Sequence, residues 1–533
     1  MADNLKLPGA APFRAFIRQI ASQCTEILLA GILLLALGLR LWGLDFGLPN
    51  LYHPDEDALV MPALSILKTG DLQPIRMDYG NLHVYTLAAV SVPVYLNDAR
   101  HGLITDPAEL PLFERGSYPA QYAFPAYFVA ARAFSALLGL AIVLLVYLLA
   151  GRLGSRRQAL LAAALAAVTP ALVTHAHFAT TDTALTFWCV LALYLLLRVY
   201  DRWEEDGWAA YAGAGFVCGL AMATKGNGLI LAGPLLLVPL LRVRRLEDGL
   251  RWRVLCGPLA MVAGFLVGTP YALLALPEFL YWTGYVLHLY QAPGVDPAGA
   301  SWQWYLNHLL RGPNAPLFLV GLLGLILSWR TWGRRGWLVN SFVLLMWLAI
   351  VTQVRREGRM WLPTAPLFAI WAALALDSVT GWLRRRLPAG WLPRASSLLF
   401  LLILLPLLAG SVRVDLALQS EDVRTQAQHW LEANLPAGTP LAVDYFPPNL
   451  DPAVWPVTRQ FHIYDQDVAW YQARGIRYVI LSQAISDPAK LGAADLAAYN
   501  DLVNQSCLVY TFTGSFLSVT KMQMWLYQLP PCP

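Results

Sequence analysis

The sequence predicts a polytopic α-helical membrane protein with about 11 transmembrane helices, a large first outer loop and a small C-terminal extracytoplasmic α/β domain. Of the 533 residues, 57% are hydrophobic and only 14% are charged, whereas soluble domains have roughly 25% charged residues. Apolar stretches recur from residue 24 to residue 413, and in lipid each backbone polar group must be satisfied within a helix. The net charge of +4 is small, and we expect no nucleic acid partner.

Eleven apolar segments are long enough to be read as membrane spans. They are 24–44, 125–150, 157–176, 183–200, 209–224, 227–241, 254–275, 313–329, 337–354, 361–378 and 395–413. The chain therefore divides into an N-terminus (1–23), a membrane domain (24–413) that contains the first outer loop (45–124), and a tail (414–533).

The distribution of charge orients these spans, because Lys and Arg collect in cytoplasmic loops. With residues 1–23 in the cytoplasm, the cytoplasmic loops hold most arginine clusters, such as Arg242, Arg244, Arg245, Arg251 and Arg253. On the opposite side, segment 45–124 has ten acidic and four basic residues, and segment 414–533 has eleven and six. We expect an integral protein of the plasma or inner membrane, with the first outer loop and the tail on the extracytoplasmic side.

Two segments of the membrane domain depart from simple spans. The apolar stretch 82–96 is short, and counting it as a span would invert every later loop. We expect it to form a helix along the outer membrane surface. The short spans 209–224 and 227–241 are separated by a Lys-Gly-Asn break, which is tolerated at membrane depth where it lines a cavity.

The tail has the pattern of a small α/β domain. TQAQHWLEAN (425–434) predicts an amphipathic helix, GIRYVILS (475–482) a buried strand, and residues 506–529 alternating strands. Cys507 and Cys532 lie in this part of the chain and are a candidate disulfide in an oxidising compartment.

The first outer loop begins with an acidic cluster, LYHPDEDALV (51–60). Adjacent side chains diverge on any regular element, so Asp55 and Glu56 are expected to have different roles. One could remove a proton from a hydroxyl group, while the other holds a metal, a sugar hydroxyl or a basic side chain. The alternative is a solvated acidic loop. His53 in the same cluster is a candidate for substrate or metal contact.

A second cluster, THAHFATTDTAL (174–185), lies at the same side of the membrane. His175, His177 and Asp182 are the residue types that bind divalent metals, although interfacial histidines often only form hydrogen bonds. Asp182 opens the next apolar span and could meet Asp55 at one membrane level. It is therefore a third catalytic candidate.

Several cations lie on the outer side, where the charge rule does not place them. The candidates are Arg355, Arg356 and Arg359 in VRREGRMWLP, Lys225 in ATKGNG, and Arg132 inside an apolar span. A guanidinium at that depth needs an anionic partner, and phosphate fits its planar fork. Pairing with the acidic candidates, or snorkelling to lipid headgroups, is the alternative.

Acids and phosphate-binding cations at one membrane level suggest a reaction on a lipid phosphate. The main alternative is a transporter or flippase for a lipid phosphate or lipid-linked sugar. Against it, no inverted repeat is visible and the ionisable residues gather at one side rather than at the midplane. A purely structural membrane protein would leave the outer arginines and the acidic cluster without a purpose.

Five pieces of the chain, in order, resemble a known enzyme family. They are HPDE after a first span, the long acidic outer loop, residues 127–185, GLAMATKGNGLIL (219–231) and RMWLPTAPLFAI (359–370). Over residues 24–380 the chain resembles polyprenyl-phosphate-sugar-dependent membrane glycosyltransferases of the C-type fold, in glycosyltransferase family 39. This family includes protein O-mannosyltransferases and the bacterial aminoarabinose transferases that act on lipid A.

The resemblance implies an inverting transfer of a hexose or pentose from a polyprenyl phosphate to an acceptor hydroxyl on the outer face. The acceptor would be a glycan, a lipid or a protein. The family's general base maps to Asp55, its second-loop acid to Asp182, and its phosphate ligands to Lys225 and Arg359. A phosphate is a good leaving group, so one base suffices, unlike in glycoside hydrolysis. Stabilisation of the departing phosphate is then the main catalytic effect.

The resemblance also bears on metal use. Some relatives hold a divalent metal with a D-x-D motif, but the second loop here reads T-T-D-T. We therefore expect no essential cofactor, and leave a divalent metal open as the alternative.

Overall fold

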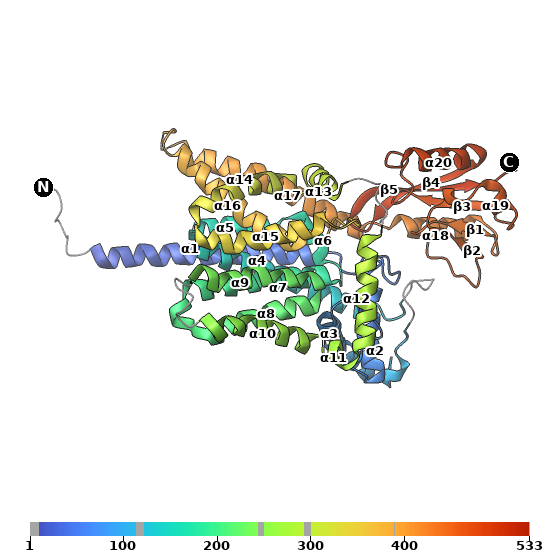
Figure 1. The fold of residues 1–533 in the computed structure, drawn as a ribbon. Helices are drawn as coiled ribbons and strands as arrows, with labels where there is room; N and C mark the ends of the chain where they lie inside the picture. Colours follow the sequence, from blue (N-terminus) through green and yellow to red (C-terminus); the bar gives the residue numbers. More distant parts are fainter. Residues whose placement is uncertain (1–9, 113–121, 243–249, 293–299, 389, 532–533) are drawn as a thin grey trace.

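The computed structural model describes residues 10–112, 122–242, 250–292, 300–388 and 390–531. Long helices lie side by side in one bundle, and a smaller domain with a sheet sits at one end of it (Figure 1). Helix α1 extends beyond the opposite end. A helical bundle and a small C-terminal sheet domain are thus two distinct parts of the fold.

The bundle is built from helices whose sequences are mostly apolar. Its elements are α1 (Ala10–Leu41), α4 (Ala126–Leu153), α5 (Arg156–Ala167), α6 (Pro170–Ala176), α7 (Thr181–Asp201), α8 (Trp203–Thr224), η2 (Gly226–Leu231), α9 (Ala232–Arg242), α10 (Leu250–Gly268), α14 (Ala315–Thr331), α15 (Arg334–Val351), η3 (Leu362–Thr364), α16 (Ala365–Leu383) and α17 (Leu392–Gln419).

The count of eleven membrane spans is not confirmed. All eleven predicted segments are mainly helical, yet within the described ranges only six helices are long and apolar enough to cross a membrane. The number rises to eight if two bent pairs, α5 with α6 and α13 (Ser301–Arg311) with α14, are each counted as one span. The apolar helices at 226–242 and 254–268 are shorter, and α8 is rich in Gly and Ala.

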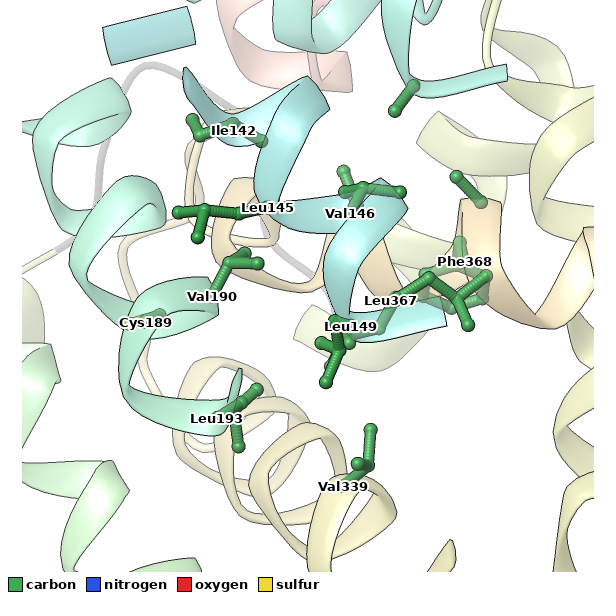
Figure 2. Packing of buried hydrophobic residues seen from close by; sticks show 14 of the residues in the cluster. Ile142, Leu145, Val146, Leu149, Cys189, Val190, Leu193, Val339, Leu367 and Phe368 are labelled. Atoms are coloured by element: carbon green, nitrogen blue, oxygen red, sulfur yellow. The ribbon is translucent and has the colours of Figure 1, made fainter. Parts of the chain in front are cut away.

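The bundle core is formed by apolar side chains from helices far apart in sequence. Figure 2 shows residues of α4, α7, α15 and α16 facing a common interior, among them Val146, Val190, Val339 and Leu367. Close helix packing requires a glycine at one position: a Cβ on Gly324 of α14 would lie 1.8 Å from the Trp371 carbonyl oxygen of α16. Small residues allow such close backbone approach between membrane helices.

Shorter helices cover the end of the bundle that faces the C-terminal domain (Figure 1). They are α2 (Asp57–Thr69), α3 (Asn81–Arg100), η1 (Pro107–Glu109), α11 (Tyr271–Leu274), α12 (Leu276–Gln291) and α13 (Ser301–Arg311). The helix predicted over 82–96 is present as α3, and α12 runs across the bundle end in Figure 1. This end carries the acidic first outer loop.

The C-terminal domain is a small α/β domain, as the tail sequence predicts. Its elements are α18 (Val423–Asn434), β1 (Leu441–Val443), β2 (Val457–Arg459), η4 (Ile463–Asp465), α19 (Val468–Gln472), β3 (Tyr478–Ser482), α20 (Ala493–Gln505), β4 (Cys507–Phe516) and β5 (Val519–Gln528). The five strands form one mixed sheet with strand order β2-β1-β3-β5-β4. Strands β2, β1 and β3 are parallel, and β5 pairs antiparallel with β3 and β4.

Alternation along the strands divides the apolar side chains of this domain between two faces. Leu441 and Ile480 pack with α18 on one face, whereas Ala442 and Val479 pack with α20 on the other. Cys507 is disulfide-bonded, and Cys532, the partner that the sequence suggests, lies outside the described residues.

Candidate active site

The candidate site lies where four segments meet at the end of the bundle that carries segment 45–124. Asp55 comes from the turn before α2, Asp182 from the first turn of α7, Lys225 from the break after α8, and Arg359 from the loop between α15 and α16. Arg359 forms an ion pair with Asp55, and its Nη1 lies 3.7 Å from Asp182 Oδ2. Lys225 Nζ lies 2.6 Å from Asp182 Oδ1. The structure thus brings these four sequence candidates together.

Local backbone structure sets the direction of the two aspartates. The Asp55 N–H donates to His53 Nδ1 over 3.3 Å, and the His53 ring lies 4.3 Å from the Phe178 ring, centroid to centroid. Asp182 stands in the first turn of α7, where the helix dipole favours a carboxylate. Both side chains are almost fully enclosed, with 7% and 4% of their surfaces exposed.

The break at Lys225, between α8 and η2, is packed closely against the first outer loop. Lys225 has an extended backbone, and its carbonyl accepts a hydrogen bond from Gly228. Gly80, just before α3, lies so near that a Cβ there would be 1.9 Å from the Ala223 carbonyl oxygen. The first outer loop therefore packs directly against the end of α8, next to the lysine.

Glu357 joins two arginines of the loop between α15 and α16. It accepts hydrogen bonds from Arg355 Nε (2.8 Å) and Arg359 Nε (2.6 Å). Burial acts to raise the pKa of Glu357, but Arg359 and Arg355 outweigh it and leave that pKa below its ordinary value. Burial likewise opposes the charge of Arg359, yet Asp55, Asp182 and Glu357 raise its pKa well above the usual range. Both groups are therefore charged at neutral pH.

Arg359 has a larger exposed fraction than Asp55 and Asp182, the two aspartates beside it. Its side chain is 16% exposed, and that of Lys225 is 10% exposed. Arg355 also reaches the cluster through Glu357, and its backbone N–H donates to the Tyr290 carbonyl. Arg356 is half-buried and lies within electrostatic reach of Tyr305.

Glu56, a catalytic candidate, and Arg132, a phosphate-binding candidate, form an ion pair apart from this cluster. Two bonds of 2.9 and 2.7 Å join their side chains, and both are fully buried. Glu56 also accepts from the Ala179 N–H, while Arg132 donates to the Leu44 and Phe46 carbonyls. Burial acts to raise the pKa of Glu56, but Arg132 outweighs it and leaves that pKa below its ordinary value. The pair is enclosed and both partners have further backbone contacts, an arrangement that favours a structural role over contact with a substrate.

The three candidate histidines do not act as one group. His53 and His175 flank Phe178 near the aspartates, and burial lowers the pKa of His53. His177 instead lies within hydrogen-bond distance of the Val173 and Trp42 carbonyls. The His-x-His pair therefore does not converge on a metal. Among the residues that the structure describes, no three His, Cys, Asp or Glu side chains form a metal-binding group.

Sequence reasoning missed two residues at the site. Glu357 stands between three arginines in RREGR, and an acid within such an arginine cluster is a signal that could have identified it. Tyr290, whose carbonyl anchors Arg355 and whose side chain lies within electrostatic reach of Lys225 and Arg359, has no such signal.

Comparison with known proteins gives partial sequence matches. The family model for dolichyl-phosphate-mannose-protein mannosyltransferases matches residues 111–290. An undecaprenyl phosphate-α-4-amino-4-deoxy-L-arabinose arabinosyl transferase of Shewanella sediminis is 27% identical over 288 residues, which are 53% of this chain and 47% of that protein. The chain thus spans about half the length of this curated relative.

Solved structures match over a larger share of the chain. ArnT from Cupriavidus metallidurans in the apo state has a TM-score of 0.52 and 14% identity, and the match covers 95% of this chain and 98% of ArnT. The same protein bound to undecaprenyl phosphate gives 0.52 and 15%, with 94% and 97% covered. The Archaeoglobus fulgidus oligosaccharyltransferase gives 0.55 and 15%, with 91% and 73% covered. At these identities the comparison shows a shared fold.

Proposed function

We propose that this chain, an integral membrane protein with the fold of the C-type glycosyltransferases, moves a sugar from a polyprenyl phosphate to an acceptor hydroxyl with inversion. The observation that carries the proposal is the cluster in which two carboxylates and two cations from four distant segments meet at one end of the bundle. The sequence relative named above is itself an undecaprenyl phosphate-linked sugar transferase, which supports the same class of donor.

The cations Arg359 and Lys225 supply the phosphate site in this proposal. Their side chains converge on Asp182, so one anion placed between them would contact both. A guanidinium can hold phosphate with two parallel hydrogen bonds, and an ammonium adds a point charge. Binding of undecaprenyl phosphate to ArnT, which shares the fold, is consistent with this assignment. Arg355 supports it indirectly, because it shares Glu357 with Arg359.

Asp55 is the general base in this proposal. Its carboxylate accepts the proton of the acceptor hydroxyl while that oxygen attacks the anomeric carbon from the face opposite the phosphate. The bond between the anomeric carbon and the phosphate oxygen breaks, and its electron pair leaves with the polyprenyl phosphate. Arg359 and Lys225 stabilise that developing charge, which is the largest single effect in reactions of this type.

The ion pair between Asp55 and Arg359 fits an exchange of partners. A donor phosphate at Arg359 competes with Asp55 for the same guanidinium, so donor binding would release the base. Glu357 still contacts Arg359 from the other side, and Asp182 keeps Lys225 in place. Asp182 therefore has a positioning role in this scheme.

We further propose that the site faces the extracytoplasmic side of a plasma or inner membrane. The arginine-rich loops support this orientation, because Arg152 and Arg335 pair with Asp201 at the end of α7 opposite to Asp182. The acceptor would be a glycan, a lipid or a protein of the cell envelope. No essential metal is part of the proposal.

The test is a transfer assay with the purified full-length chain in detergent. A polyprenyl phosphate carrying a radiolabelled sugar is added together with a cell-envelope extract as the acceptor source. We expect the label to move to the acceptor and polyprenyl phosphate to be released. If the chain were a transporter, the labelled lipid would stay intact and would instead change leaflet in reconstituted vesicles, which would overturn the proposal.

A further inference from the structure

We propose that the C-terminal domain positions the general base, and that Arg424 at the start of α18 is the positioning residue. The inference rests on the proposed role of Asp55. It starts from one contact: Arg424 Nη1 donates to the Tyr52 carbonyl over 3.3 Å, three residues before Asp55. This bond joins the C-terminal domain to the loop that carries the base.

Arg424 is held rigidly by its own domain. Its guanidinium forms two hydrogen bonds of 2.8 Å with Asp422, and Asp422 also caps α18 by accepting the Arg424 N–H. The guanidinium carbon lies 4.0 Å from the Tyr52 ring centroid and 4.3 Å from that of Phe516. An arginine with one ion-pair partner and two aromatic faces has little freedom to move.

A second set of buried polar contacts fixes the same loop. The hydroxyl groups of Tyr52 and Thr425 are hydrogen-bonded at 2.5 Å, and Asn50 donates to the Tyr52 hydroxyl over 3.0 Å. Asn449 of the C-terminal domain donates to Asn50 over 2.7 Å. Tyr52, Asn50 and Asn449 are all buried. Such buried polar contacts specify one arrangement, because an unmade partner would be costly.

An apolar contact reaches Asp55 by a separate route. Leu517, between β4 and β5, packs on the cluster that contains Phe178. The Phe178 ring in turn lies against His53, which accepts the Asp55 N–H. The domain therefore contacts the segment just before Asp55 directly at Tyr52 and, through Phe178, at the His53 ring.

The loop needs such external support. Residues 51–56 form only turns before α2 begins, so no helix or strand fixes the Asp55 backbone. A catalytic group displaced by about 1 Å can lose about 10²-fold in rate. Contacts from a rigid neighbouring domain are a physical means of preventing that displacement.

The experiment compares full-length Arg424→Gln and Arg424→Lys with a matched control, Arg474→Gln. Arg474 is an exposed arginine of the same domain that stacks on Trp470. For Arg424→Gln we expect kcat to fall about tenfold with the donor KM unchanged, because the displaced base affects only the chemical step. Arg424→Lys should recover part of the loss, since a point charge cannot reproduce the fork. Arg474→Gln should behave as wild type.

Hydrogen exchange distinguishes positioning from general unfolding. We expect faster amide exchange in residues 50–57 of Arg424→Gln, with unchanged exchange in strands β1, β3 and β5. Faster exchange throughout the domain, or a kcat equal to wild type, would overturn the inference. If Arg424→Gln cannot be purified, Tyr52→Phe removes only the hydroxyl that meets Thr425 and Asn50, and should lower kcat with the donor KM unchanged.

The result also separates this inference from the proposed function. An inactive Asp55→Asn together with a fully active Arg424→Gln would reject the positioning role and leave Asp55 as the base. An active Asp55→Asn would reject Asp55 as the general base of the proposed function, whatever the Arg424 variants show.

Discussion

Two adjacent carboxylates in this chain belong to two different ion pairs. Asp55 pairs with Arg359 in a cluster whose arginine is partly exposed, whereas Glu56 pairs with Arg132 in a fully buried contact. Arg132 donates from Nε and Nη2 to Glu56 and from Nη1 to two backbone carbonyls, so all three of its nitrogens have acceptors within the protein. Around Arg359 three carboxylates compete for one guanidinium. The buried pair of Glu56 and Arg132 is suited to stabilising the fold. Arg359, which is partly exposed and has three carboxylate partners, is suited to exchanging one of them for a substrate.

The two ion pairs should also respond differently when one partner is removed. Desolvation of a buried ion pair is offset only while both charges remain, so removing one partner is strongly destabilising. In the open cluster, Arg359 keeps Asp182 and Glu357 as partners when Asp55 is removed. Substitution in the enclosed pair should therefore lower the free energy of unfolding, and substitution in the open cluster should lower activity.

The largest effect is expected for Asp55→Asn. Loss of the proton acceptor should reduce transfer at least 10²-fold, the usual scale for general-base removal. Arg359 retains Glu357 and Asp182, so donor binding and thermal stability should stay near wild type. Single-turnover transfer and equilibrium donor binding measure the two quantities. Asp71→Asn, an exposed acid of the same outer loop, serves as the control; near-normal turnover of Asp55→Asn would move the base to Asp182.

Glu56→Gln should instead lower the stability of the fold more than the activity. It leaves the Arg132 charge buried without its carboxylate, and breaking such a pair costs about 3–5 kcal/mol of unfolding free energy. The activity of the remaining folded protein should fall far less than in Asp55→Asn. Denaturant unfolding in detergent, with transfer normalised to folded protein, checks both points. A stable but inactive Glu56→Gln would return Glu56 to the reaction.

Arg359→Ala should produce a smaller loss of transfer activity, which arises from weaker binding of the donor. It removes a charge-assisted contact to phosphate, worth about 1.5–3 kcal/mol, so donor affinity and transfer both decrease. Arg359→Lys should restore only part, because an ammonium cannot form the bidentate contact. Equal donor affinity in wild type, Ala and Lys variants would mean that Arg359 only reaches toward lipid headgroups. A donor-bound structure with the phosphate more than about 6 Å from both Arg359 and Lys225 would also reject the assignment.

The sequence could predict which residues meet, but not how they pair. Asp55, Asp182 and Lys225 each lie at the outer end of an apolar segment, so topology alone sets them at one level. Glu56 pairs with Arg132 because the turn directs the adjacent side chains of Asp55 and Glu56 apart. The Leu44 and Phe46 carbonyls also hold the Arg132 guanidinium in place. Such directions arise from packing, which local sequence does not encode.

Two expectations are not settled by the local sequence. Hydrophobicity alone cannot tell a short apolar helix such as 254–268 from a full crossing, so the count of eleven spans is not confirmed. The spacing of His177 left a metal open as an alternative, and both of its ring nitrogens lie within hydrogen-bond distance of backbone carbonyls. The α/β tail was easier, because alternation and strand length are properties of the local sequence.

The smallest effect, and the one that tests the enclosed pair most directly, is the pH dependence of stability. The pKa of Glu56 in the folded chain lies below its ordinary value of 4.5, so the folded state binds fewer protons there than the unfolded state. The resulting stability is fully present above about pH 4.5 and is lost as the pH falls through the folded value. The difference in unfolding free energy between wild type and Glu56→Gln should therefore narrow below about pH 4.5. Glu204→Gln, at an exposed site, should show no such narrowing. A difference that stays constant from pH 7 to about pH 3 would mean that Glu56 is not held ionised by Arg132.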